Sequence, residues 1–154
     1  MKANQLEFLK DVWPQERDFL ERPDRLKYVR KIVRPKGCVF CSAAKAGVSF
    51  ESLVLFKKKG TLVVLNKYPY NTGHLLVLPL QHCGDLTKLS SAKSQKVSEM
   101  VRLAAQILLK TYGCPGLNIG LNHGTAGGAG IPNHLHWHIV PRWVGDTNFF
   151  PVLA

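Results

Sequence analysis

The sequence predicts an α+β domain in which an antiparallel sheet packs against one main helix. Three observations lead to this fold class. Five short apolar stretches have strand character, the connections between neighbouring strands are short, and one long stretch has the period of an amphipathic helix. A length of 154 residues, with 45% apolar and 20% charged residues, suits one ordinary globular domain.

The strands are predicted from apolar runs bounded by turn residues. Residues 54–56 and 61–65 flank Lys57-Lys58-Lys59-Gly60 and form a hairpin with glycine at its turn. After a loop over 68–73, the third strand covers His74 to Pro79 and is apolar enough to be central in the sheet. The fourth strand covers Leu117 to Asn122, and the fifth runs from His134 to Val140 and stops at Pro141.

The main helix is predicted over residues 91–112. Its apolar residues recur at intervals of three and four, and Gly113 and Pro115 follow in the order expected at a helix end. Residues 1–36 mix charges with prolines, so we expect an N-terminal extension that packs on the domain. The domain itself is assigned to residues 37–154.

The charge balance is strongly basic. Lysine and arginine number 21 against 10 acidic residues, a net charge of +11 that attracts nucleotides, polyphosphates or nucleic acid, or only keeps the protein soluble. The basic residues concentrate in 25–36 and in 57–59. No apolar run is long enough to span a membrane and no signal peptide is apparent, so we expect a cytoplasmic location with no membrane partner.

Three histidines in alternate positions form the most informative motif. On a strand, His134, His136 and His138 point to one side and form a row of imidazoles, while the residues between them face the core. Such a row serves either metal binding or nucleophilic catalysis. The preceding loop, Thr125 to Gly130, is rich in glycine, which lets backbone N–H groups approach phosphate oxygens. Loop, histidines and charge together favour phosphate chemistry, whereas His123 is expected to be an exposed loop histidine.

A second motif is the C-x-x-C of Cys38 and Cys41. Two thiolates at this spacing are a common half of a zinc site, and two further ligands must come from elsewhere. A redox pair of the thioredoxin type needs a strand before the motif, which Pro35-Lys36-Gly37 does not support. Two buried free cysteines are the remaining alternative.

The H-x-H-x-H row followed by Pro141-Arg142 resembles the histidine-triad (HIT) superfamily of nucleotidyl hydrolases and transferases. Asn66, Gly73-His74 and Asn122 match further positions of that family. The segments Arg25 to Tyr28 and Pro141 to Phe149 are similar to a bacterial branch that includes diadenosine tetraphosphate phosphorylases. The chain departs from many relatives at Gly130-Ile131, where those have Gln-Ser.

The resemblance implies the HIT fold, a homodimer and a role for each site residue. His136 would be the nucleophile, with His138 and Asn122 as further catalytic residues. The nucleotide-binding residues would be Asn66, His74, Gly127, Gly128, Ala129, Gly130 and Ile131. A structural zinc ion would be held by Cys38, Cys41, His82 and His134, as in zinc-containing members.

The predicted function is nucleotidyl transfer on adenosine polyphosphates through a covalent histidine intermediate. Inorganic phosphate as acceptor would convert diadenosine tetraphosphate to ADP and ATP, whereas water would make a dinucleoside polyphosphate or phosphoramidate hydrolase that releases AMP. A basic nucleic-acid-binding protein is disfavoured, because Tyr28 is the one aromatic residue among 25–36. A metalloenzyme with the three histidines as ligands stays open. No Walker A, H-E-x-x-H or G-x-S-x-G motif occurs.

Overall fold

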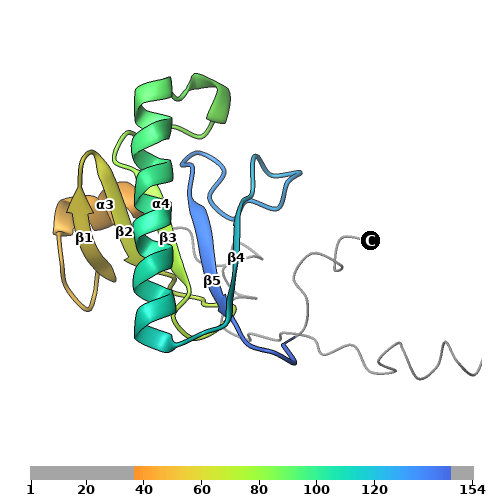
Figure 1. Cartoon of the computed structure of the whole chain (residues 1–154). Helices are drawn as coiled ribbons and strands as arrows, with labels where there is room; N and C mark the ends of the chain where they lie inside the picture. Colours follow the sequence, from red (N-terminus) through yellow and green to blue (C-terminus); the bar gives the residue numbers. More distant parts are fainter. Residues whose placement is uncertain (1–36, 147–154) are drawn as a thin grey trace, which may run out of the picture.

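The computed structural model describes residues 37–146, which form a five-stranded antiparallel sheet with helices packed against it (Figure 1). The strand order is β1-β2-β3-β5-β4. The elements in chain order are α3 (Val39–Ala46), β1 (Val54–Lys58), β2 (Thr61–Leu65), β3 (Leu75–Pro79), the 3₁₀ helix η1 (Leu86–Lys88), α4 (Ser91–Tyr112), β4 (Gly116–Leu121) and β5 (Trp137–Arg142). The predicted α+β fold class is confirmed, and no helix among residues 37–146 combines the length and apolar character needed to cross a membrane.

The predicted hairpin is formed by β1 and β2. Lys58 pairs with Thr61, so the turn consists of Lys59 and Gly60 alone. Both have positive φ, 51° and 79°, as a type I′ turn requires. This turn matches the right-handed twist of the strands on either side.

The sheet has an apolar core on each face, and β3 contributes to both. Val77 belongs to the first core cluster, which includes buried residues of α4 such as Met100. Leu76 and Leu78 belong to the second cluster, which Phe40 of α3 covers. Because neighbouring strand residues point to opposite faces, α4 and α3 lie on opposite sides of the sheet (Figure 1).

Helix α4 has the bounds that the sequence predicts. It runs from Ser91 to Tyr112 and buries Val97 among other apolar residues. Gly113 takes the left-handed conformation at φ 58° and ψ 23°, and its N–H donates to the carbonyl of Leu109. The glycine therefore ends the helix by the mechanism expected from the sequence.

The predicted fifth strand over 134–140 is wrong in its extent, since β5 covers Trp137–Arg142. Strand β4 ends at Leu121, whose partner is Trp137, so the residues before β5 have no strand to pair with on that side. The N–H of Leu135 donates instead to the carbonyl of Cys83 at 2.7 Å. Two of the three motif histidines therefore precede the strand.

Helix α3 was not among the elements that the sequence predicts individually. It begins after Cys38 and ends before Gly47, whose φ of 79° is in the left-handed region. Helix α3 buries a single residue, Phe40. The N-terminal extension over 1–36 and the last part of the tail, Thr147 to Phe149, lie outside the described residues.

Candidate active site and metal-binding group

The second and third histidines of the motif lie together on the sheet face opposite α4. His138 pairs across the sheet with Leu76 of the second core cluster, whereas Trp137 and Ile139 pack with the cluster of α4. The rings of His136 and His138 have their centroids 5.1 Å apart. The predicted common face for these two histidines is therefore present, although His136 precedes the strand.

His136 is buried and its tautomer is set by the backbone. It is 5% exposed, and its Nδ1–H donates to the carbonyl oxygen of His134 at 2.8 Å. In a neutral imidazole the other nitrogen, Nε2, then carries the lone pair. Burial lowers the pKa of His136, an effect that the hydrogen bond to His134 partly opposes. Burial therefore favours the neutral ring, in which the hydrogen bond to His134 places the lone pair on Nε2.

His74, the residue directly before β3, forms a hydrogen bond with His138. His74 is 1% exposed, and its Nδ1 accepts a hydrogen bond from the backbone N–H of Tyr70 at 3.0 Å. Its Nε2 then carries the proton and donates to His138 Nδ1 at 2.9 Å. Because Nδ1 of His138 accepts this hydrogen bond, the neutral tautomer of His138 has its proton on Nε2. The Tyr70 ring stacks on both imidazoles, at 4.9 Å from His74 and 5.9 Å from His138.

Asn66 and Asn122 approach the face from two different segments. Asn66 follows β2, and its side-chain oxygen accepts from the N–H of Tyr68 at 3.0 Å, while its Nδ2 lies 3.2 Å from His74 Nδ1. Asn122 follows β4, and its Nδ2 donates to the carbonyl of Gly128 at 3.4 Å. The Asn66 amide therefore lies beside His74, and the Asn122 amide lies beside the glycine-rich loop.

The glycine-rich loop folds back on itself and is largely exposed. The N–H of Ala129 donates to Gly124, and that of Gly128 to Thr125, both at 3.0 Å. A Cβ on Gly127 would lie 2.4 Å from the carbonyl oxygen of His123, so this close approach requires glycine. Gly130, at the end of the loop, is exposed, and the next residue, Ile131, packs against the second core cluster.

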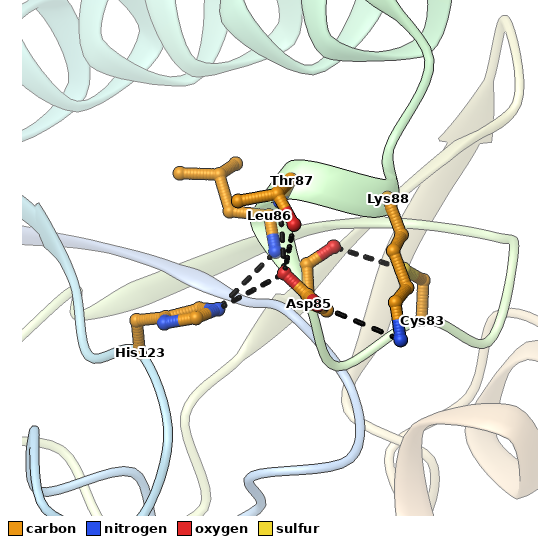
Figure 2. A network of polar contacts seen from close by, with 6 residues as sticks. All are labelled: Cys83, Asp85, Leu86, Thr87, Lys88 and His123. Atoms are coloured by element: carbon orange, nitrogen blue, oxygen red, sulfur yellow. Dashed lines mark hydrogen bonds and ion pairs between the residues drawn. The ribbon is translucent and has the colours of Figure 1, made fainter.

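His123 is exposed as predicted, and it connects the glycine-rich loop to the segment before α4 (Figure 2). Its Nε2 accepts from the N–H of Leu86 at 3.2 Å and lies 3.6 Å from the Asp85 carboxylate. Asp85 accepts two hydrogen bonds from Thr87, which together with the nearby Lys88 lower the pKa of this carboxyl. Sequence reasoning missed this anchor, because the partner of His123 lies 37 residues away.

Four metal-ligand side chains converge at the N-terminal end of α3. Cys38, Cys41, His82 and His134 each place one donor atom within 4.8 Å of all the others. His134 Nδ1 lies 3.3 Å from Cys38 Sγ and 3.7 Å from Cys41 Sγ, and His82 Nδ1 lies 3.4 Å from Cys41 Sγ. With Zn–S of about 2.3 Å and Zn–N of about 2.0 Å, the edges of a tetrahedral zinc site are roughly 3.5 Å. The donor set and its spacing therefore fit zinc.

The surroundings of these four residues also suit a metal ion. His134 is 1% exposed, and its Nε2–H donates to the carbonyl of Pro79 at 2.9 Å, which turns Nδ1 toward the thiols. Burial, followed by the neighbouring Cys38, raises the pKa of the Cys41 thiol, so metal binding would release its proton. Among the described residues, the one group that could hold a metal includes His134 without the other two motif histidines.

The chain belongs to the HIT family: the HIT domain matches residues 49–144. Two curated relatives with named activities are similar to it. "AP-4-A phosphorylase" of Mycobacterium tuberculosis is 39% identical over 104 residues, which cover 68% of this chain and 53% of the relative. "Bis(5'-adenosyl)-triphosphatase" of Saccharomyces cerevisiae is 32% identical over 98 residues, covering 60% and 47%. The chain thus spans about half the length of these relatives.

Solved structures agree with this family assignment. A Zn-bound histidine triad family protein from Mycobacterium smegmatis has a TM-score of 0.65 at 28% identity, covering 74% of this chain and 81% of its own. A hypothetical histidine triad nucleotide-binding protein from Sulfolobus tokodaii has a TM-score of 0.64 at 27% identity, covering 73% of each chain. The HIT fold that the motif predicts is confirmed.

Proposed function

We propose that this protein transfers nucleotidyl groups from adenosine polyphosphates and that His136 is the nucleophile. The observation that carries the proposal is the hydrogen bond from His136 Nδ1–H to the His134 carbonyl. In the neutral ring, this bond leaves a buried imidazole with its lone pair on Nε2, next to His138. The names of the mycobacterial and yeast relatives support adenosine polyphosphates as substrates.

In the first step, Nε2 of His136 attacks the α-phosphorus of the substrate. The bond between this phosphorus and its bridging oxygen breaks, and the remaining polyphosphate leaves. From diadenosine tetraphosphate the leaving group is ATP, and AMP stays bound to His136. His138, with a proton on Nε2, donates a hydrogen bond to the phosphoryl group and so stabilises its charge.

Four other segments would bind the substrate or support the histidines. The Asn122 amide and the backbone N–H groups from Gly127 to Ile131 would stabilise the phosphoryl oxygens. Asn66 would bind the ribose hydroxyls. His74 was expected to bind nucleotide; its 1% exposure and its bond to His138 favour a role in fixing the His138 tautomer instead.

In the second step, we propose that inorganic phosphate attacks the histidine-bound AMP. The P–N bond breaks, ADP forms and His136 is regenerated. The name "AP-4-A phosphorylase" of the mycobacterial relative supports this acceptor. Water is the alternative acceptor and would release AMP; the triphosphatase name of the yeast relative supports that alternative. The Arg25 to Tyr28 segment, which suggested the phosphorylase branch, lies outside the described residues.

We further propose that Cys38, Cys41, His82 and His134 hold a structural zinc ion. Zinc bound there would cross-link α3 to the segments that follow β3 and precede β5, and it would take no direct part in the reaction. The donor spacing and the zinc in the mycobacterial structure support this assignment. The homodimer and the cytoplasmic location stay predictions.

The experiment that tests the function is product analysis with diadenosine tetraphosphate. The purified protein is incubated with this substrate in the presence and absence of inorganic phosphate. ADP plus ATP formed only with phosphate supports the phosphorylase, whereas AMP plus ATP at millimolar phosphate supports the hydrolase. Absence of both product pairs, with the protein folded and zinc-loaded, would contradict nucleotidyl transfer from this substrate.

A further inference from the structure

Phe40 joins the metal-binding group to the nucleophile. In the sequence it lies between the two cysteines of the C-x-x-C motif, and in the structure it is 6% exposed. Its ring meets the His134 ring edge-on, with centroids 5.5 Å apart, and lies against the His136 ring at 5.0 Å. One side chain thus contacts both a metal ligand and the nucleophile.

His134 makes a second connection between the same two places. Its Nδ1 faces the thiols of Cys38 and Cys41, while its backbone carbonyl accepts the Nδ1–H of His136. The residue that would bind zinc is therefore also the residue that sets the tautomer of the nucleophile. A shift of His134 would weaken the hydrogen bond that keeps the lone pair on His136 Nε2.

Helix α3, which carries Phe40, is attached to the sheet by few large side chains of its own. It has eight residues; Phe40 is the one that is fully buried, and the smaller Val39, Ala43 and Ala44 are partly buried against the same core cluster. Lys57 adds a hydrogen bond from its Nζ to the Ala44 carbonyl at 2.8 Å, but the pair is exposed. A helix this short is not stable alone. Ligation of Cys38 and Cys41 together with His82 and His134 would therefore be its strongest link to the sheet.

We propose that metal binding positions the nucleophile through α3, with Phe40 as a positioning residue. With the four ligands joined, Phe40 and the His134 carbonyl hold the His136 ring in one orientation and one tautomer. Without the metal, α3 loosens and His136 samples both tautomers, of which only one can attack. This inference rests on the proposed function of His136.

The test reads the His136 tautomer directly, by nitrogen-15 NMR of the full chain with labelled histidine. Zinc-loaded protein should show His136 with its proton on Nδ1 alone. Zinc depletion, or Phe40→Leu in zinc-loaded protein, should give a mixture of tautomers. The turnover number should fall by roughly tenfold or more in both cases, while KM changes less than about threefold, because positioning rather than substrate binding is lost.

A matched control separates positioning from general loss of packing. Leu62 is fully buried in the same core cluster as Phe40 and is not a site residue, so Leu62→Val should leave the tautomer unchanged. A single tautomer in zinc-depleted folded protein or in Phe40→Leu would overturn the proposal, as would an equal shift in Leu62→Val. If the zinc-depleted protein unfolds, the proposal is decided by comparing the His136 tautomers in zinc-loaded Phe40→Leu and Leu62→Val. A tautomer shift in a protein that turns over no nucleotide would instead contradict the proposed function.

Discussion

Gly127→Ala should disable the glycine-rich loop without unfolding the domain. The added Cβ would lie 2.4 Å from the backbone oxygen of His123, about 1 Å short of an ordinary contact at 3.4 Å. Because the position of a Cβ is fixed by the backbone and the atom it meets is a main-chain oxygen, the loop itself must move by about that distance. A displacement of 1 Å at a positioned site costs on the order of 100-fold in rate, which is about 2.7 kcal/mol of transition-state stabilisation. Because the loop is exposed, the substitution should lower the free energy of unfolding by less than about 2 kcal/mol.

The assay compares kcat/KM for diadenosine tetraphosphate and the free energy of unfolding in urea for two alanine variants. Gly116→Ala is the matched control, since its Cβ meets nothing within 4 Å and its φ is not positive. It should keep full activity and equal or slightly higher stability. Full activity in Gly127→Ala would refute the reasoning, because the loop would then not have to approach the phosphate in this conformation. An equal loss in Gly116→Ala would refute it as well.

Three further outcomes are expected. His136→Ala should lose nearly all turnover and all covalently bound nucleotide while its circular dichroism stays native; near-normal turnover would contradict the nucleophile assignment. Elemental analysis of protein purified without chelator should find one zinc per chain, and the Cys38→Ser, Cys41→Ser double variant should lower Tm by roughly 4–8 °C, as a loss of about 2 kcal/mol implies. His74→Ala should lower kcat more than it raises KM, because His74 bonds to His138 and is buried; a rise in KM alone would show that His74 binds substrate.

The elements that could be predicted from the sequence are those fixed by local patterns. The glycine of the hairpin turn and the Gly113 cap of α4 act within a few residues, so their signals are complete in the sequence. The start of β5 could not be predicted, because it depends on where β4 stops, at Leu121. Helix α3 escaped prediction because its eight residues span little more than two turns, too few for helical periodicity to be recognised in the sequence.

The candidate site shows the same division between local and distant information. The C-x-x-C spacing predicts two ligands, but His82 and His134 lie 41 and 93 residues from Cys41, so the resemblance to the family was needed to name them. The contact of His74 with His138 joins residues 64 positions apart. The burial of His74 follows from the sheet order, in which β3 lies beside β5 and not beside β4, the next strand in the sequence.

The metal-binding group lies on the same side of the sheet as the histidines of the proposed active site, since Phe40 contacts both His134 and His136. On the α4 side, the sheet is covered by an apolar cluster that includes four buried residues of that helix. On the other side, part of the surface is given to His74, His136 and His138, which cannot be replaced by apolar residues if they are to perform the proposed chemistry. The helix on that side fully buries only Phe40, and its other apolar contacts come from small, partly buried side chains. A zinc ion held by Cys38 and Cys41 would add a cross-link to this limited apolar packing, and through His134 it would do so beside the proposed nucleophile, His136.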